Sequence, residues 1–510
     1  MNMAEKISQY RADRIRKLKD LREKGVNPYP YKYEINAKSI ELKKKYDAIS
    51  PEEHVDNEYS LAGRIMQIRN MGKACFLNLQ DEVGKIQIYI QVDTVGKDNF
   101  KLLKKLDIGD IFGVKGNIFK TKTEEVTINV KEFTILTKSI EQLPEKHHGL
   151  VDKEIKFRKR YLDLIVNPEV KEVFKKRSLM ISTIRKFLDK RNYMEVETPL
   201  LQTQYGGANA RPFETHINAW DMKMFLSISP ELYLKRLIVG GFEKVYTICK
   251  NFRNEGVDHS HNPEFTMIEI YEAYKDYKDM MKLIEDCYEF VCLKINGTTN
   301  VLKNVRDHET GVIKEVKLNF KAPWKRITMV DSIKEHLDID VNEMSIEELK
   351  KYLIKKKIEL KKKDMSWGDC IIEIFDELIE PKIIQPTHIY NRPKESTPLC
   401  KELRGDDRFV EQCEPICCGM EIGNMYSELN DPLKQNELLE EQAKLLRAGG
   451  DESHPMDEDF INAIDVGLPP TGGIGWGIDR MAIILLNQDS IRDVLLFPTM
   501  KNETNEEEKQ

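Results

Sequence analysis

Short strand-like segments follow one another closely between residues 58 and 138, and they limit the fold of this region more than any other feature of the chain. Residues 86–90, Ile-Gln-Ile-Tyr-Ile, alternate with period 2, as a strand with one buried face does. The other segments, separated by Gly, Asp or Lys/Thr turns, are 61–70, 74–80, 111–119 and 126–136. Five short strands within about 80 residues are typical of a small antiparallel barrel. The sequence therefore predicts a barrel of the OB-fold type over residues 56–145.

Strand parity assigns side chains to the two faces of this barrel. Leu77 and Leu79 point to the core, so Phe76 points outward, and Gln87 does the same on the next strand. An outward aromatic ring beside polar side chains, here with Arg69 nearby, suits single-stranded RNA, because the ring stacks on a base while polar groups bind its edge. The alternative is that Phe76 packs under a neighbouring loop or domain.

The rest of the chain is long enough for further domains. A length of 510 residues exceeds one ordinary core. Residues 1–55 are charged and predict a helical extension, and residues 146–510 mix helices and strands. A helix is predicted over 168–191 and a mainly helical stretch over 276–380. Within the latter, the lysine-rich residues 349–363 predict a helix with a solvated face rather than a nucleic-acid contact.

Charge and apolar content exclude several classes of protein. The 80 basic residues nearly balance the 86 acidic ones, so the chain is not a net-basic coat for nucleic acid. No apolar run approaches the ~20 residues that span a bilayer, and the N-terminal residues lack the apolar core of a secretory signal. We therefore expect no membrane partner and a cytoplasmic location. The adjacent Cys417 and Cys418 do not have zinc-knuckle spacing and predict buried or half-buried thiols.

Alternating glycines mark a site near the C-terminus. Gly473, Gly475 and Gly477 share one face of a strand-like segment, which indicates that a flat or bulky group approaches the backbone closely. Arg480 follows at the start of a helix, where anions are favoured. The segment is not a Walker motif, and a tightly packed strand–helix joint also requires glycines. By itself it is a weak sign of a nucleotide site.

Two strand-like segments around a loop strengthen that sign. Residues 252–255 and 261–271 flank the loop 256–260, for which a polar phosphate-facing role is preferred over a metal pair of histidines. On the second strand, parity places on one face Phe265, Met267, Glu269 and Tyr271. A ring able to stack on a base is thus followed by an acid and a phenol.

A third segment offers paired carboxylates. A tight turn at 417–419 is expected to set Glu414 and Glu421 opposite each other on paired strands. Like charges in that position are destabilising unless a cation bridges them, and carboxylates beside a triphosphate commonly bind Mg²⁺. Two exposed rim glutamates remain the alternative. The residues expected to share the other face are Asn424, Tyr426 and Glu428.

Together these segments resemble the class II aminoacyl-tRNA synthetases and, among them, the lysyl-tRNA synthetase family, over nearly the whole chain. The regions similar to motifs 1, 2 and 3 lie at about 185–200, 246–273 and 472–486, and the class I signatures HIGH and KMSKS are absent. Nearly matching stretches include Pro-Glu-Leu-Tyr-Leu-Lys-Arg at 230–236 and His-Asn-Pro-Glu-Phe-Thr at 261–266. Ser260, where bacterial members carry Arg, departs from the pattern, and so does Tyr426, where many carry Phe.

The resemblance implies an α+β fold and a two-step ligase. An OB-fold anticodon-binding domain precedes a catalytic domain built on a mixed, largely antiparallel sheet flanked by helices. Lysine attacks the α-phosphate of ATP and releases pyrophosphate, and the lysyl-adenylate then passes lysine to tRNA(Lys) and releases AMP. Such chemistry depends on positioning and charge neutralisation.

The family's functional residues carry over to matching positions. Arg253 and Arg480 become the catalytic residues, with Arg253 on the α-phosphate and the lysine carboxylate and Arg480 on the terminal phosphate. Glu414 and Glu421 become Mg²⁺ ligands, and Phe265 stacks on adenine. The other implied ATP contacts are Glu255, His261, Asn262 and Gly477. The implied anticodon contacts are Arg69, Phe76, Gln87 and Glu125. Motif 1 implies a homodimer.

Lysine itself requires buried acid, because its ε-ammonium loses water on binding. Glu269 and Glu428 supply it, with Tyr271 as a hydrogen-bond partner. The remaining implied lysine contacts are Gly207 and Glu231 for the α-amino group, Asn424 and Arg253 for the carboxylate, and Tyr426 and Gly475.

Three other functions are weighed against this one. An aspartyl or asparaginyl enzyme shares the domain plan, but an aspartyl pocket needs a cation where these acids lie. A non-enzymatic RNA-binding paralogue is expected to have lost residues such as Arg253 or Arg480. A lysyl ligase acting on a protein is expected to lack the N-terminal barrel.

Overall fold

The computed structural model describes residues 3–144, 150, 152–306, 310–360, 364–447 and 455–502. The chain divides into two compact units, Met1–Val151 and Asp152–Gln510. The predicted domain boundary at 145/146 and residues 361–363 of the lysine-rich stretch fall outside the described residues. No helix in the described ranges combines the length and apolar character that crossing a bilayer demands.

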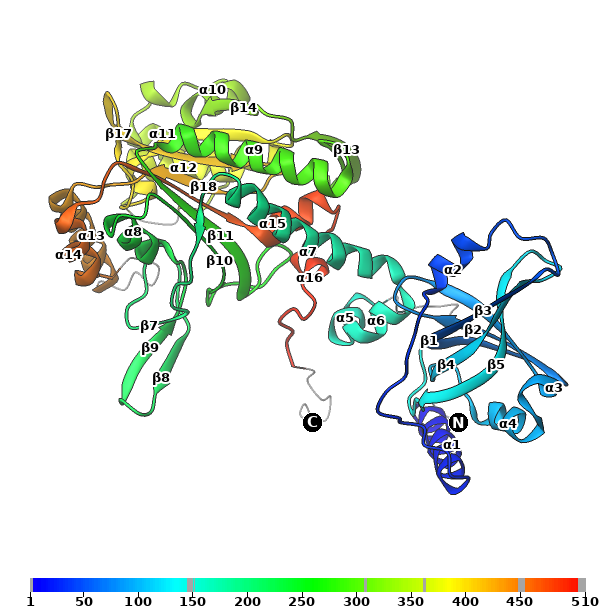
Figure 1. Cartoon of the computed structure of the whole chain (residues 1–510). Helices are drawn as coiled ribbons and strands as arrows, with labels where there is room; N and C mark the ends of the chain where they lie inside the picture. The colour runs from blue at the N-terminus through cyan, green and yellow to red at the C-terminus, as the bar shows by residue number, and fades with distance from the viewer. Residues whose placement is uncertain are drawn as a thin grey trace. The chain divides into compact units, whose positions relative to one another are not determined.

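The first unit is a barrel preceded by helices (Figure 1). Its elements are α1 (Met3–Glu23), α2 (Ser39–Lys45), β1 (His54–Met71), β2 (Ala74–Gln80), β3 (Lys85–Gln91), α3 (Val92–Val95), α4 (Lys97–Leu102), the 3-10 turn η1 (Leu103–Lys105), β4 (Ile111–Lys120) and β5 (Val126–Thr137). The strands close in the order β1-β2-β3-β5-β4. The predicted strands are therefore confirmed, and β1 begins earlier than its pattern indicated.

The barrel core follows the predicted parity. Leu77, Leu79, Ile86, Ile88 and Ile90 are at most 2% exposed, and Phe76 on the other face is half-buried. Alternation with period 2 thus separated the core face from the outer face correctly.

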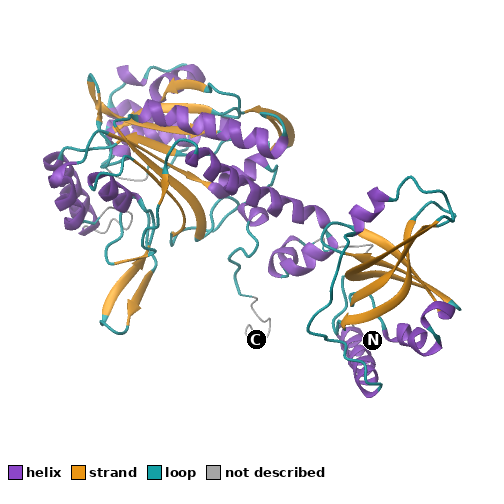
Figure 2. Cartoon of the chain, viewed as in Figure 1, coloured by secondary structure: helices purple, strands orange, loops and turns teal. Residues whose placement is uncertain are grey.

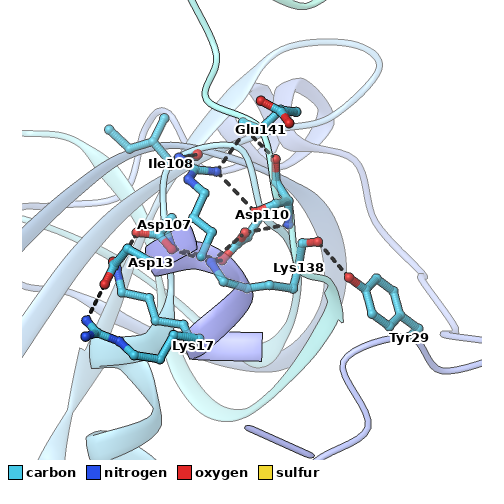
Figure 3. Close-up of polar contacts among 11 residues, drawn as sticks. Asp13, Lys17, Tyr29, Asp107, Ile108, Asp110, Lys138 and Glu141 are labelled. Carbon is cyan, nitrogen blue, oxygen red and sulfur yellow. Dashed lines mark hydrogen bonds and ion pairs between the residues drawn. The ribbon is translucent and has the colours of Figure 1, made fainter. Parts of the chain in front are cut away.

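A buried lysine ties the helix α1 to the barrel (Figure 3). The Lys138 ammonium lies 2.9 Å from Asp110 Oδ2 and also pairs with Asp107, and both Lys138 and Asp110 are buried. Lys17 of α1 reaches Asp107 at 2.7 Å, and Arg14 donates to the Ile108 carbonyl at 2.9 Å. The charged N-terminal helix is therefore fixed to the barrel by ionic contacts.

The second unit is a large sheet with helices packed on it. Its helices are α5 (Lys153–Arg158), α6 (Arg160–Val166), α7 (Pro168–Asp189), α8 (Glu231–Val239), α9 (Tyr277–Asn296), α10 (Met329–Leu337), α11 (Ile346–Lys355), α12 (Trp367–Leu378), α13 (Pro432–Arg447), α14 (Glu458–Gly467), α15 (Ile478–Leu485) and α16 (Ile491–Val494), with the 3-10 turns η2 (Val341–Glu343), η3 (Glu380–Lys382) and η4 (Lys394–Ser396). Its strands are β6 (Met194–Glu195), β7 (Leu201–Gln202), β8 (Glu214–Ile217), β9 (Met222–Leu226), β10 (Lys244–Phe252), β11 (Glu264–Ala273), β12 (Asn300–Arg306), β13 (Ile313–Asn319), β14 (Lys325–Thr328), β15 (Thr387–Pro393), β16 (Glu402–Leu403), β17 (Asp406–Ile416), β18 (Asn424–Ser427) and β19 (Thr471–Gly477).

The main sheet runs β14-β15-β17-β18-β19-β11-β10-β6, with β16 beside β17. Only the pairs β14–β15 and β10–β6 at its two ends are parallel within the described sheet, so the sheet is mixed and largely antiparallel. Figure 2 shows the strands in orange with purple helices alongside. The predicted α+β fold, an OB-type barrel and a helix-flanked mixed sheet, is confirmed.

One face of the sheet is covered by α9 and α15, with α7 packed on α9. Ile268, Ile270, Ile474 and Trp476 point into this core and are at most 1% exposed. The helix α9 begins with a capping box at Asp276. Since successive strand residues alternate between faces, residues 267, 269, 271, 473 and 475 point to the opposite face.

The stretch 276–380 is less helical than its pattern predicted. It contains α9–α12, but β12 and β13 pair as a hairpin and β14 joins the main sheet. In β12, Val301 and Lys303 are buried and Leu302 is 55% exposed, so lysine and apolar residues do not divide between faces as the period-2 pattern requires. In α11, Leu349 and Leu353 face a core beside exposed lysines, as expected for a solvated helix face.

Candidate active site

A cavity of about 610 Å³ lies on the face of the sheet opposite α9 and α15, where α8 also packs on β10 and β11. Every residue predicted for the ATP site lines it: Arg253, Glu255, His261, Asn262, Phe265, Glu414, Glu421, Gly477 and Arg480. Those predicted for lysine that also line it are Gly207, Glu231, Arg253, Glu269, Tyr271, Asn424, Tyr426 and Gly475. Glu428 is not among the described lining residues. The sequence thus identified residues from distant segments that share one cavity.

The strand β11 supplies the cavity floor in the predicted order. Phe265, Met267, Glu269 and Tyr271 all line the cavity. The Arg253 guanidinium lies 5.2 Å from the centre of the Phe265 ring. Burial lowers the pKa of Arg253 below its ordinary value, although an arginine in that position stays charged. The site therefore presents an aromatic ring and a fixed cation side by side.

The glycines of β19 leave room for the side chains of neighbouring strands. A Cβ atom at Gly473 would lie 1.9 Å from Glu428 Oε1 and 2.5 Å from Tyr271 Cε1. A Cβ at Gly475 would lie 3.2 Å from Glu269 Cγ. These glycines are therefore required by acidic and phenolic side chains of the protein itself.

Arg480 is held by a short chain of polar contacts. It lies in the first turn of α15, and its Nη1 donates to the Glu421 carbonyl at 2.7 Å. Its Nη2 lies 3.4 Å from His261 Nε2, and His261 Nδ1 lies 2.9 Å from Asp258 Oδ2. Burial alone would raise the pKa of Asp258, but hydrogen bonds from Ser260 and His261 lower it. A negative Asp258 thereby favours Nδ1–H on His261, leaving Nε2 to accept from Arg480.

The register of the carboxylate turn corrects one expectation. Glu421 pairs with Ile416, so Glu414 and Glu421 are diagonal neighbours rather than directly opposite. The reason is the short turn, in which Cys417 and Met420 already share backbone hydrogen bonds of 2.9 Å and 3.2 Å. Both carboxylates still line the cavity. The buried or half-buried thiols predicted here are confirmed, since Cys417 is buried and Cys418 is half-buried.

Glu414 forms an ion pair with an arginine. Arg392 Nη1 lies 2.5 Å from Glu414 Oε2, and Asn424 Nδ2 donates to Glu414 Oε1 at 3.2 Å. Burial, partly offset by Arg392 and increased by the charge of Glu421, raises the pKa of Glu414 to about 8. No local pattern in the sequence distinguishes Arg392 from a surface arginine, so its pairing with Glu414 was not predicted.

The opposite end of the cavity is acidic. Glu269 is 4% exposed, and it accepts hydrogen bonds from Ser229 Oγ at 2.7 Å and from the Tyr271 hydroxyl at 3.2 Å. Burial and the neighbouring Glu231 raise the pKa of Glu269 to about 8 despite these bonds. Gly207, with φ +83°, lies against Glu231 and Ser229, where a Cβ would come within 2.9 Å of both.

Glu428 lies behind this end and is paired with Lys235. The Lys235 ammonium lies 2.5 Å from Glu428 Oε2 and 2.6 Å from Glu231 Oε1. Lys235 and Glu428 are both 0% exposed. Lys235 was part of a matched stretch in the sequence, but nothing in that stretch revealed its distant partner.

The barrel carries the second predicted site. Phe76 faces Tyr89 with ring centres 4.6 Å apart, and Arg69 is cross-strand from Phe76. Arg69 Nη2 donates to Gln87 Oε1 at 3.1 Å. Three of the four predicted residues therefore form one patch on β1, β2 and β3. Glu125 instead pairs with Lys43 of α2 at 2.7 Å.

Comparison with family models identifies both units. The model of class II tRNA synthetases (D, K and N) matches residues 152–501, and the model of the OB-fold nucleic acid binding domain matches residues 59–136.

Curated proteins similar to the chain share one name. A lysine--tRNA ligase of Clostridium novyi is 48% identical over 505 residues, which is 98% of this chain and 96% of that protein. The lysine--tRNA ligase of Thermoanaerobacter pseudethanolicus is 49% identical over 502 residues, 98% of this chain and 97% of that protein. The lysine--tRNA ligase of Thermosipho africanus is 46% identical over 504 residues, with 98% of both chains covered.

Proposed function

The chain belongs to the class II tRNA synthetases and, within them, to the lysine--tRNA ligases, and from this membership we propose how its two sites divide the reaction. It attaches lysine to tRNA in a reaction that ATP drives. The observation that carries the assignment of the sites is the acidic end of the cavity, next to an aromatic ring and two arginines.

Lysine lies with its ammonium groups toward the acidic end. Glu269 and Tyr271 accept the ε-ammonium, and Glu231 with the Gly207 backbone accepts the α-amino group. Asn424, Tyr426 and Gly475 complete the walls of this half of the cavity, where they line it beside Glu269. The proposal for Glu428 is a supporting negative charge, since it lies behind the lining residues.

ATP takes the other half. Phe265 stacks on adenine, and Arg253 bridges the lysine carboxylate and the α-phosphate, which brings the reacting oxygen and phosphorus together. Arg480 neutralises the terminal phosphate. The proposed further contacts are Glu255, His261, Asn262 and Gly477. The carboxylate of lysine attacks the α-phosphate and pyrophosphate leaves, so fixed cations stabilise the charge that develops.

Mg²⁺ fits Glu414 and Glu421. These two carboxylates line the cavity, and each lies beside an arginine, Glu414 beside Arg392 and Glu421 beside Arg480, so an added cation would share them with those guanidinium groups. In the described part of the chain no three His, Cys, Asp or Glu side chains gather to hold a metal. Two carboxylates with phosphate oxygens are nevertheless a usual Mg²⁺ ligand set. When bound, the ion neutralises triphosphate charge.

The barrel binds the tRNA anticodon through Arg69, Phe76 and Gln87, which form one patch. Glu125 joins them only if it leaves Lys43. Because the tRNA product is used by ribosomes, we propose that the enzyme is cytoplasmic. We also propose a homodimer through motif 1, in and beside which Met194, Leu200 and Leu201 are 41–50% exposed.

Pyrophosphate exchange tests the lysine pocket. Among the amino acids tried one at a time, only lysine should support exchange. Glu269→Gln should weaken lysine binding by about 2–5 kcal/mol and leave ATP binding nearly unchanged, because an ammonium loses its charged partner in a desolvated pocket. Exchange with aspartate, or an unchanged lysine KM in the variant, would contradict the assignment.

A further inference from the structure

Lys235 is a buried cation that the proposed reaction does not use. It lies on α8, one turn after Glu231, and its ammonium contacts the carboxylates of Glu231 at 2.6 Å and Glu428 at 2.5 Å. The ammonium also lies 5.7 Å from the centre of the Phe460 ring. A lysine that is 0% exposed is expected only where paired acids compensate the lost hydration.

The charges at this end of the cavity balance those of lysine when Lys235 is counted. When lysine is bound, the ionised Glu231, Glu269 and Glu428 supply three negative charges, and Lys235, which pairs with two of them, offsets one. Two negative charges remain for the two ammonium groups of the substrate. Without Lys235, Glu231 and Glu428 would lie close together in a desolvated region with no cation between them, and like charges there favour protonation.

One oxygen of each carboxylate contacts the Lys235 ammonium, and the other oxygen does not. Lys235 meets Oε1 of Glu231 and Oε2 of Glu428. The other oxygen of Glu428, Oε1, points to Gly473, whose missing side chain makes room for it. Lys235 therefore fixes the rotation of both carboxylates as well as their charge.

We propose that Lys235 is a positioning residue for lysine selection, which orients Glu231 and Glu428 and favours their ionised forms, so that the pocket supplies two net negative charges to bound lysine. This inference rests on the proposed assignment of the acidic end to the substrate's ammonium groups. Lys235 does not touch lysine and acts only through the two glutamates.

The surrounding titratable groups agree with this role. Those facing Glu428 and Lys235 from neighbouring elements are Glu231, Glu269, Tyr271, Cys400 and Tyr426. Burial raises the pKa of Glu428 to about 8, Lys235 opposes that rise, and Glu231 and Glu269 add to it. Of these groups Lys235 alone is a cation, so its loss moves the pKa of Glu428 further upward.

The test is the pH dependence of lysine binding in Lys235→Met, an uncharged side chain of similar length. Loss of the cation should raise the pKa of the acidic end by about one unit or more, so lysine KM at neutral pH should rise about tenfold or more. The loss should recover as the pH increases, with kcat at saturating lysine and the KM for ATP changed much less. A pH-independent loss in all three parameters would show a packing role and overturn the proposal.

A double variant distinguishes failure of the proposed Lys235 role from failure of the lysine-pocket assignment. Glu428→Gln with Lys235→Met removes both charges of the pair, which buried sites tolerate better than loss of one partner. In the Glu428→Gln background, Lys235→Met should shift the pH profile less than it does in the wild type, because only its effect through Glu231 remains, so the two effects should be non-additive. Fully additive effects would overturn the role of Lys235. Unchanged lysine KM in Glu269→Gln would instead refute the pocket assignment itself.

Discussion

Burial changes the chemistry of single residues at the acidic end of the cavity. Glu269 accepts two hydrogen bonds, yet burial and the neighbouring Glu231 raise its pKa to about 8. The carboxyl is therefore mostly protonated near neutral pH when the pocket is empty. An arriving ammonium reverses that balance, because a cation favours the ionised form. Binding of lysine is thus expected to release a proton.

This raised pKa predicts a pH dependence of lysine binding. Affinity for lysine should increase from about pH 6 to about pH 8, by up to tenfold per unit, and then level off. Calorimetry in buffers of different ionisation enthalpy should show proton release below about pH 8 and little above it. Without lysine, the folded state binds more protons than the unfolded one between about pH 5 and 8, so the free energy of unfolding should fall as pH rises there. Lysine affinity that is flat across this range would refute the pKa argument.

At the scale of elements, the glycines of β19 leave space in the cavity wall for side chains of β11 and of the segment after β18. Gly473→Ala should therefore displace Glu428 and Tyr271, whose atoms lie 1.9 Å and 2.5 Å from the added Cβ. We expect a lysine KM raised at least tenfold, roughly 1.4 kcal/mol. Gly477→Ala on the same strand is the control, since its Cβ would meet nothing closer than 3.7 Å. Both variants are assayed at saturating ATP, because Gly477 is a proposed ATP contact. Equal loss of lysine binding in both variants would contradict the steric explanation.

The ionic network of Lys17, Asp107, Asp110 and Lys138, which joins α1 to the barrel, gives a second prediction at this scale. Lys138→Met should leave Asp107 and Asp110 without their shared cation and cost about 3–5 kcal/mol of the first unit's stability. All four tryptophans, Trp220, Trp324, Trp367 and Trp476, belong to the second unit. If only the first unit loses stability, the midpoint of thermal unfolding followed by far-ultraviolet circular dichroism should fall more than the midpoint followed by tryptophan fluorescence.

The control for this buried ionic network is a surface ion pair of the same barrel. Lys131→Met removes an exposed contact to Glu58 of 3.4 Å, which should cost less than about 1 kcal/mol. If Lys138→Met behaves like Lys131→Met, the buried network does not stabilise the unit.

At the scale of the whole molecule, the two units should be separable by function. Phe76→Ala removes a stacking platform worth roughly 1–3 kcal/mol per base. Charging of tRNA below saturation should fall by about one to two orders of magnitude, while lysine-dependent pyrophosphate exchange stays near wild type. Phe133→Ala, which removes a half-buried ring packed 5.2 Å from Phe112, controls for barrel stability. Equal loss of charging and exchange in Phe76→Ala would end the anticodon assignment for this residue.

The homodimer is the other prediction at this scale. The chain should sediment at about twice 59.5 kDa, because exposed apolar side chains near motif 1 are expected to be covered by a second copy. Met194→Asp and Leu201→Asp together should shift the sedimentation toward the monomer. A fully active monomer at assay concentration would contradict the proposed assembly.

The sequence by itself determined what depends on periodicity and on neighbours along the chain. Period 2 located the barrel strands and put Phe76 outside and Leu77 inside. The same parity gathered the residues of β11 and the glycines of β19 on one face, which the structure confirms as the cavity floor. Such patterns survive because a residue's face follows from the backbone geometry of its own strand.

Only the tertiary structure decided which buried charges meet. Lys235 with Glu428, and Arg392 with Glu414, come from different elements, and no local pattern links them. The register at Glu421 and the hairpin β12–β13 depended likewise on pairing between strands rather than on period. Buried ionic pairs need a partner in space to offset desolvation, and a chain specifies that partner only when it is folded.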